Sequence, residues 1–134
     1  MDSVVTAAQT LGVYLDNKQQ SQFKRYRELI ELRNKQFNLT GLKTWEKIRE
    51  ELFIRSLRVL APAGGNVPTR EWFEGKQAID VGTGAGIPGI VLKIAVPELK
   101  ITLIDSNKKR TNFLTEVVNA LELNDAHVVN GRAE

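Results

Sequence analysis

The chain has 134 residues, 42% of them hydrophobic and 26% charged, which is typical of one soluble globular domain. The absence of cysteine excludes disulfides, zinc–thiolate sites, iron–sulfur clusters and cysteine nucleophiles within this chain, and the one histidine is His127. No apolar run approaches the roughly 18 residues of a membrane span, and the first residues carry no basic segment of the signal-peptide kind. We therefore expect a cytoplasmic protein with no membrane partner.

The net charge of +3 is unevenly distributed along the chain. Residues 1–60 contain 11 Lys/Arg and 7 Asp/Glu, a net charge of +4, whereas residues 61–134 contain 8 and 9, a net charge of −1. The positive excess in the first half is compatible with a polyanionic partner, and equally with a solvated helix face.

Hydrophobic periodicity predicts two helices at the start of residues 1–60. The first spans residues 3–15, with Ser3 as its N-cap, and the second runs from about Lys18 to Gln36. An apolar stripe at helical spacing in the second helix favours core packing over base stacking. Its members are Phe23, Tyr26, Ile30 and Phe37.

A third helix follows the turn at residues 38–41, and Thr44 is its predicted N-cap. Its expected apolar face consists of Ile48, Leu52, Val59 and Leu60. Residues 61–76 are rich in proline and glycine, which indicates a linker between this helical segment and the rest of the chain.

Residues 77–134 alternate between short apolar runs and helical patterns. Strands are predicted at 77–81, 100–105 and 127–129, and helices at 87–96 and 108–121. This order is typical of a parallel α/β fold. The predicted architecture is therefore an N-terminal helical segment followed by the first, incomplete half of a Rossmann-like domain.

A glycine-rich segment, D-V-G-T-G-A-G-I-P-G, connects the first strand to the first helix of this half. Glycine lets the backbone turn tightly and approach a ligand, and α/β sheets bind ligands at this end of their strands. Gly84, Gly86 and Gly89 match the dinucleotide fingerprint G-x-G-x-x-G. The acidic-x-G-x-G-x-G pattern of S-adenosylmethionine sites also fits, beginning at Asp80 and including Gly82. The second frame is favoured because it starts directly after the strand and accounts for Asp80.

Asp105 ends the second strand, 19 residues after Gly86. A carboxylate at this place can accept hydrogen bonds from both ribose hydroxyls of a nucleoside. Both candidate cofactors contain ribose, so Asp105 indicates a nucleoside-type ligand without choosing between them. The alternative role for Asp105 is to cap the helix that begins at Lys108.

Taken in order, these motifs resemble the RsmG (GidB) family of 16S ribosomal RNA guanine-N7 methyltransferases. The resemblance runs from about Phe23 to the end of the chain. The matching motifs are Asn38-Leu39-Thr40, the string from Asp80 to Ile90, Leu103-Ile104-Asp105-Ser106, Lys109-Arg110, Phe113-Leu114 and Gly131-Arg132-Ala133-Glu134.

The resemblance implies S-adenosylmethionine as the cofactor and 16S ribosomal RNA, or the small ribosomal subunit, as the partner. It places cofactor contacts at Gly82, Ile87, Ala133 and Glu134, with Asp105 on the ribose. Together with the residues of the glycine frame, the expected cofactor-binding set is Asp80, Gly82, Gly84, Gly86, Ile87, Asp105, Ala133 and Glu134. The resemblance also places Lys109 and Arg110 on a basic surface.

Two features depart from the family pattern. The family carries a His-x-x-Asp-Ser motif in the helix before the linker, and here Leu52 and Arg55 replace the His and the Asp, while Ser56 is kept. The family's sheet also continues beyond Glu134. We therefore expect a truncated, inactive fragment whose first strand leaves an exposed sheet edge, through which the chain can associate with itself.

The implied reaction is attack of guanine N7 on a sulfonium methyl group. N7 already has an in-plane lone pair, so no general base is required, and we expect no catalytic side chain and no metal. Two alternatives are a basic RNA-binding module without catalysis and a nicotinamide-dependent Rossmann oxidoreductase.

Overall fold

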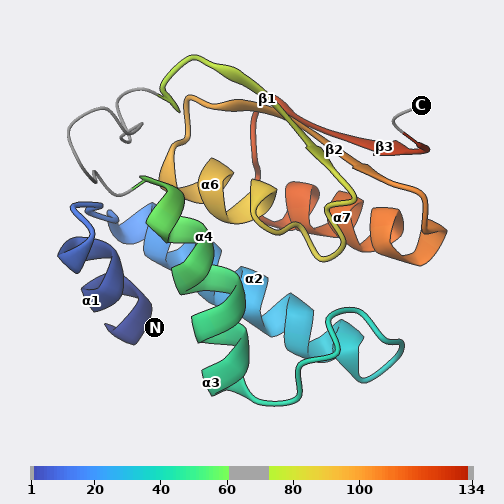
Figure 1. Cartoon of the computed structure of the whole chain (residues 1–134), viewed down its shortest axis with the longest axis horizontal. Coiled ribbons are helices and arrows are strands. Elements are labelled where there is room, and N and C mark those ends of the chain that lie inside the picture. The colour runs from blue at the N-terminus through green and yellow to red at the C-terminus, as the bar shows by residue number, and fades with distance from the viewer. Residues whose placement is uncertain (1, 61–72, 133–134) are drawn as a thin grey trace.

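The computed structural model describes residues 2–60 and 73–132, and in this part of the chain the elements form three layers (Figure 1). A parallel sheet forms one outer layer, and two helices that follow its strands pack against one face. The N-terminal helices lie on the far side of those two helices. The predicted architecture, a helical segment followed by a parallel α/β half, is confirmed.

The described sheet has three parallel strands in the order β1-β2-β3. They are β1 (Gln77–Val81), β2 (Lys100–Asp105) and β3 (Ala126–Asn130). The register pairs Asp80 with Leu103, and Leu103 with Val128. Parallel strands with this register bring the carboxyl ends of β1 and β2 to the same edge of the sheet.

Helix α6 (Gly89–Ala95) follows β1, and helix α7 (Lys108–Ala120) follows β2. All seven residues of α6 are buried, because the helix lies between the sheet and the N-terminal helices (Figure 1). Even Lys93 is buried, and its Nζ donates to the carbonyl oxygens of Pro97 and Leu99. The bounds of both helices agree with the predicted ranges to within two residues.

The first helix is shorter than predicted. Helix α1 (Asp2–Thr10) ends where Gly12 adopts a positive φ of +82°. Gly12 N donates to Gln9 O and Val13 N to Ala8 O, a Schellman cap that closes the helix. The prediction of a helix over 3–15 is therefore wrong beyond residue 10, and Ser3 lies inside α1 instead of capping it.

Helix α2 (Asn17–Asn34) begins with a capping box. Asp16 Oδ1 accepts a hydrogen bond from Gln19 N, and Gln19 Oε1 accepts one from Asp16 N, both at 2.8 Å. The predicted stripe does face the core, with Phe23, Tyr26 and Ile30 buried. Two buried acceptors at the end of α6 also bind this helix, since Gln19 Nε2 donates to Ile94 O and Ala95 O.

The third helical segment is continuous but not uniformly α-helical. It consists of α3 (Trp45–Lys47), a π-helical stretch η1 (Ile48–Ile54), α4 (Arg55–Leu57) and a 3₁₀ turn η2 (Arg58–Leu60). Thr44 caps it as predicted, with Oγ1 accepting from Lys47 N at 3.3 Å.

The π-helical stretch changes which residues face the core. Its i to i+5 hydrogen bonds widen the turn, so Phe53 and Leu57 are fully buried whereas Leu52 is only half-buried. Ile48 and Leu60 are buried as predicted, but Val59 is 44% exposed. Placing Val59 on the apolar face was wrong, because that prediction assumed an α-helical period throughout.

Most of the predicted linker, residues 61–76, lies outside the described residues; only 73–76 are described. The division at residues 60 and 76 therefore stays a prediction. Among the described residues, no helix is both long and apolar enough to cross a membrane.

Candidate functional site

The glycine turn lies at the edge of the sheet where β1 and β2 both end. Gly82 N and Thr83 N donate to the carbonyl oxygen of Ile104 in β2, at 2.8 and 3.2 Å. These bonds extend the β1–β2 pairing past the end of β1. As a result, the turn lies beside Asp105, as its place in the sequence predicted.

Asp80, the second-last residue of β1, holds the glycine turn through two hydrogen bonds. Its Oδ2 accepts hydrogen bonds from Thr83 Oγ1 at 2.7 Å and from Gly89 N, the first residue of α6, at 2.9 Å. Burial raises the pKa of Asp80, and the two hydrogen bonds partly offset that rise because they favour the charged carboxylate. Both bonds are internal to the strand–turn–helix unit. A direct contact between Asp80 and a cofactor stays a prediction.

The glycines of the turn divide into two kinds. Gly82 and Gly84 have φ values of +69° and +60°, and a Cβ added at either would meet no atom within 4 Å. A Cβ at Gly86 would instead lie 2.4 Å from Ile90 Cγ1, and one at Gly89 would lie 2.5 Å from Leu103 Cδ2. Gly82 and Gly84 therefore border open space, whereas Gly86 and Gly89 are required by packing.

Asp105 is 6% exposed, and it bonds the turn directly. Its Oδ2 accepts from Gly84 N at 2.9 Å and its Oδ1 from Asn107 N at 2.8 Å. The N-cap of α7 is Asn107, whose side chain accepts from Arg110 N, so the alternative that Asp105 caps this helix is wrong. A carboxylate has about four acceptor positions, and these two bonds leave others for further donors.

Of the remaining predicted cofactor-binding residues, Ile87 lies next to the glycine turn, and the other two are outside the described part of the chain. Ile87 is half-buried directly after the turn. Ala133 and Glu134 are outside the described residues, although Gly131 N, two residues before Ala133, donates to Asp105 O at 3.0 Å. The path of the chain after β3 thus starts beside the same carboxylate residue.

One side chain at the turn was not foreseen as part of the site. Tyr26 Oη, from α2, donates to the carbonyl oxygen of Ala85 at 2.5 Å. Sequence periodicity identified Tyr26 only as a core residue, because it gives no information on a contact across 59 positions. Thr83 was also missed, although its place between two glycines of the turn was a visible signal.

His127 lies away from this edge. It is exposed and pairs in register with Thr102, near the start of β2. Leu52, Arg55 and Ser56, which stand at the positions of the family's His-x-x-Asp-Ser motif, lie in the third helical segment. Ser56 is buried and its hydroxyl donates to Leu52 O, while Arg55 is exposed. Ser56 is thus satisfied within its own helix.

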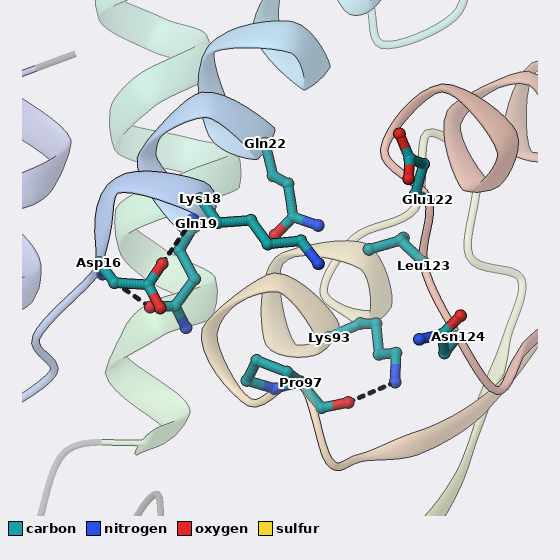
Figure 2. Close-up of a pocket in the computed structure, with 9 residues that line it drawn as sticks. All are labelled: Asp16, Lys18, Gln19, Gln22, Lys93, Pro97, Glu122, Leu123 and Asn124. Atoms are coloured by element: carbon teal, nitrogen blue, oxygen red, sulfur yellow. Dashed lines mark hydrogen bonds between the residues drawn. The ribbon is translucent and has the colours of Figure 1, made fainter.

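A separate cavity of about 80 Å³ lies at the opposite end of α6 from the glycine turn (Figure 2). Lys18 and Gln22 extend from α2 toward Lys93 of α6 in this view. Burial lowers the pKa of Lys93, with Asp125 and Glu98 partly offsetting that effect. Gln22 Nε2 donates to Leu121 O and Lys93 to two carbonyls, so these lining groups hold elements together.

No described group of three or more His, Cys, Asp or Glu side chains is arranged to hold a metal ion. Within residues 2–60 and 73–132, the candidate site is therefore the glycine turn with Asp105, resting on Asp80 and Tyr26.

Comparisons with known proteins identify the family of this chain. The family model described as "rRNA small subunit methyltransferase G" (GidB) matches residues 19–134. A protein of Leuconostoc citreum is 40% identical over 134 residues, covering 100% of this chain and 54% of the relative. One of Clostridium kluyveri is 39% identical over 129 residues, covering 96% of this chain and 52% of the relative.

A third relative, from Roseiflexus castenholzii, is 40% identical over 134 residues, again covering 100% of this chain and 54% of the relative. All three relatives carry the name ribosomal RNA small subunit methyltransferase G. The chain spans about half the length of these curated relatives. With a family model matching most of its length, the chain belongs to the GidB family of rRNA small subunit methyltransferase G proteins.

Proposed function

We propose that this protein is an S-adenosylmethionine-dependent methyltransferase that acts on N7 of a guanine in 16S ribosomal RNA. The observation that carries the proposal is the open backbone at Gly82 and Gly84 beside the buried carboxylate of Asp105. This arrangement has room for a ligand and an acceptor for its hydroxyl groups, in a family named for methylation of small-subunit ribosomal RNA.

The described residues fit the proposed cofactor. Gly82 and Gly84 leave the space that a nucleoside needs to approach the backbone. Asp105 has acceptor positions left for the two ribose hydroxyls, and Ile87 offers apolar surface next to the turn. Ala133 and Glu134 are expected beside the adenine, on the strength of the family resemblance.

The dinucleotide frame fits this turn less well. In that frame Gly84, Gly86 and Gly89 are the three fingerprint positions, and the second one must let the pyrophosphate approach the backbone. Here Gly86 is sealed, because Ile90 and the hydroxyl of Tyr26 lie 2.4 and 3.0 Å from where its Cβ would be. The open positions, Gly82 and Gly84, are the first two glycines of the methyltransferase frame, whereas its third glycine, Gly86, is packed.

The chemistry asks little of ionisable side chains. When bound, S-adenosylmethionine would supply an electrophilic sulfonium methyl group, and guanine N7 would be the atom that accepts it. Guanine N7 has an in-plane lone pair, so no base has to remove a proton first. The protein's part is to hold the two reactants in line, and positioning of this kind supplies up to roughly 7–11 kcal/mol of the barrier.

The basic helical segment is the proposed contact for ribosomal RNA or the small subunit. Lys43 is exposed just before α3, Lys47 is exposed at its last residue, and Lys109 is exposed in the first turn of α7. Cationic side chains bind a phosphate backbone without sequence preference. From the proposed substrate, we expect the protein to work in the cytoplasm.

Self-association is a separate expectation. In the described part of the sheet β1 is an edge strand, and Ile79 is 69% exposed. An exposed apolar edge can pair with a second copy. Light scattering behind size exclusion distinguishes a dimer, which supports this expectation, from a monomer, which contradicts it.

The proposed activity is tested by methyl transfer with the longest encoded form of the protein. Radiolabelled S-adenosylmethionine and small subunits or 16S RNA from cells lacking the enzyme are the substrates. The expected product is 7-methylguanosine, identified by mass spectrometry of the nucleosides, with Gly84→Val as the inactive control. Methylation at another atom, or none by a folded protein that binds the cofactor, contradicts the proposal.

A further inference from the structure

Tyr26 links the N-terminal helical segment to the tip of the glycine turn. It lies in α2, is fully buried, and donates from its hydroxyl to Ala85 O at 2.5 Å. Ala85 stands between Gly84, which borders open space, and Gly86, which is packed. The hydroxyl also lies 3.0 Å from where a Cβ of Gly86 would be. The hydroxyl group therefore bonds Ala85 and also lies in the space that a side chain at Gly86 would need.

The rest of the turn is held from the α/β half. The β2 carbonyl of Ile104 accepts from two amides, Asp105 accepts from Gly84 N, and Asp80 accepts from Thr83 and Gly89. These bonds fix the two ends of the turn and the amide of Gly84. Tyr26 adds a bond to the next carbonyl from a different layer of the protein.

The ring of Tyr26 is itself held in place. It stacks on Phe53 with ring centroids 5.3 Å apart and planes 14° apart. Trp45 lies edge-on to Phe53 with ring centroids 5.7 Å apart, and the Arg27 guanidinium lies 3.9 Å from the Trp45 ring centroid. Phe53 belongs to the π-helical stretch, which is what turns it inward. A donor on such a ring has little freedom to follow a displaced carbonyl.

The phenol also keeps its proton. Burial raises the pKa of Tyr26 well above its ordinary value, and the negative charge of Asp80 raises it further. The hydroxyl therefore remains a hydrogen-bond donor across the neutral and mildly alkaline range.

We propose that Tyr26 is a positioning residue for the cofactor turn, so that α2 helps to set the affinity for the cofactor through the Ala85 carbonyl. This inference rests on the proposed function of the turn as the S-adenosylmethionine site. Tyr26 does not touch the reacting atoms. It holds the backbone carbonyl of Ala85, the residue directly after Gly84, whose open side is the proposed cofactor surface.

The test compares Tyr26→Phe with a matched control in the same helix. Tyr26→Phe removes only the hydroxyl and keeps the ring in its stack. Gln19→Met removes the buried side-chain hydrogen bonds from α2 to Ile94 O and Ala95 O, and with them the Oε1 acceptor of the α2 capping box, all away from the turn. Because Gln19→Met loses more hydrogen bonds than Tyr26→Phe, it is expected to lower the melting temperature at least as much, so a loss of stability alone cannot account for an effect confined to Tyr26→Phe.

The first readout needs no ligand. In the free protein, hydrogen exchange of the amides of residues 84–86 is expected to quicken about tenfold in Tyr26→Phe and to stay at the parent rate in Gln19→Met. Equal exchange at these amides in all three proteins would overturn the inference, whatever the cofactor is.

The second readout is cofactor affinity in the longest encoded form. Tyr26→Phe is expected to raise the Kd and KM of S-adenosylmethionine by about fivefold, with kcat at saturating cofactor changed less than about twofold. Gln19→Met is expected to bind like the parent. A Kd for Tyr26→Phe within about twofold of the control's refutes the positioning role. If the parent itself does not bind, the proposed function fails, and the exchange result still decides the role of Tyr26.

Discussion

Replacing Gly84 by alanine tests whether the open space at the turn belongs to a ligand. Gly84 has φ +60°, and a Cβ there meets no atom within 4 Å. The Gly84→Ala variant should therefore be less stable than the parent only by the cost of placing alanine in a left-handed conformation, roughly 1–2 kcal/mol. For a domain of this size that is a fall of a few degrees in Tm. The added methyl group would, however, occupy the space that the ligand is proposed to fill, so the substitution should weaken binding much more than it lowers stability.

Gly12 supplies the matched control. It also has a positive φ, +82°, with no atom within 4 Å of an added Cβ, but it lies at the end of α1. Gly12→Ala should therefore lower the Tm by about as much as Gly84→Ala does. Gly86→Ala should cost more than either, because its Cβ would lie 2.4 Å from Ile90.

The assay is thermal unfolding of the four variants Gly84→Ala, Gly84→Val, Gly12→Ala and Gly86→Ala, together with calorimetric titration of S-adenosylmethionine into each, using the longest encoded form. We expect Gly84→Ala to weaken binding at least about tenfold, Gly84→Val to abolish it, and Gly12→Ala to bind like the parent. Equal affinities for Gly84→Ala and Gly12→Ala at matched stability would refute the reasoning, because the open side of Gly84 would then face only solvent.

Three further predictions concern charged residues. Asp105→Ala should weaken cofactor binding by about 1.5–3 kcal/mol, the scale of a hydrogen bond to a charged group; unchanged calorimetric affinity in a folded variant contradicts it. Arg33 bonds Glu116 through two atoms at 2.6 and 2.9 Å and lowers the Glu116 pKa. The stability that this pair contributes is fully present at pH values above the pKa that Glu116 has in the unfolded state. It is lost as the pH falls through the pKa of Glu116 in the folded state, which is the lower of the two. The Tm difference between parent and Glu116→Gln should therefore shrink on acidification, and a difference that grows in acid refutes this. Charge reversal in the basic segment should weaken 16S RNA binding and flatten its salt dependence without changing cofactor affinity, whereas equal affinity across a salt series assigns these residues to a solvated face. The residues to reverse are Lys43, Lys47 and Arg49.

Local patterns sufficed to predict the α/β half. Strands β1 to β3, helices α6 and α7 and the place of the glycine turn follow from short apolar runs and turn residues, which are properties of neighbours in the chain. The proximity of Asp105 to the turn also followed, since parallel strands end at one edge of a sheet.

Features that depend on tertiary packing could not be read in this way. The π-helical stretch makes Phe53 the buried residue in place of Leu52. No pattern in the sequence indicated that the helix would change there from the α-helical to the π-helical period. The division of the glycines into open and packed positions depends on Ile90 and Tyr26, which only the folded chain brings to Gly86. Asp105 and Asn107 are both of the residue types favoured at a helix N-cap, so the sequence alone leaves both possible, and the folded chain uses Asn107.

The account depends most on which cofactor the turn binds. Calorimetric titration of the longest encoded form with S-adenosylmethionine, its demethylated product and a nicotinamide dinucleotide tests this directly. The geometry of Gly82, Gly84 and Asp105 predicts saturable binding of the first two and no heat from the dinucleotide. Tight dinucleotide binding with no heat from S-adenosylmethionine would contradict the account.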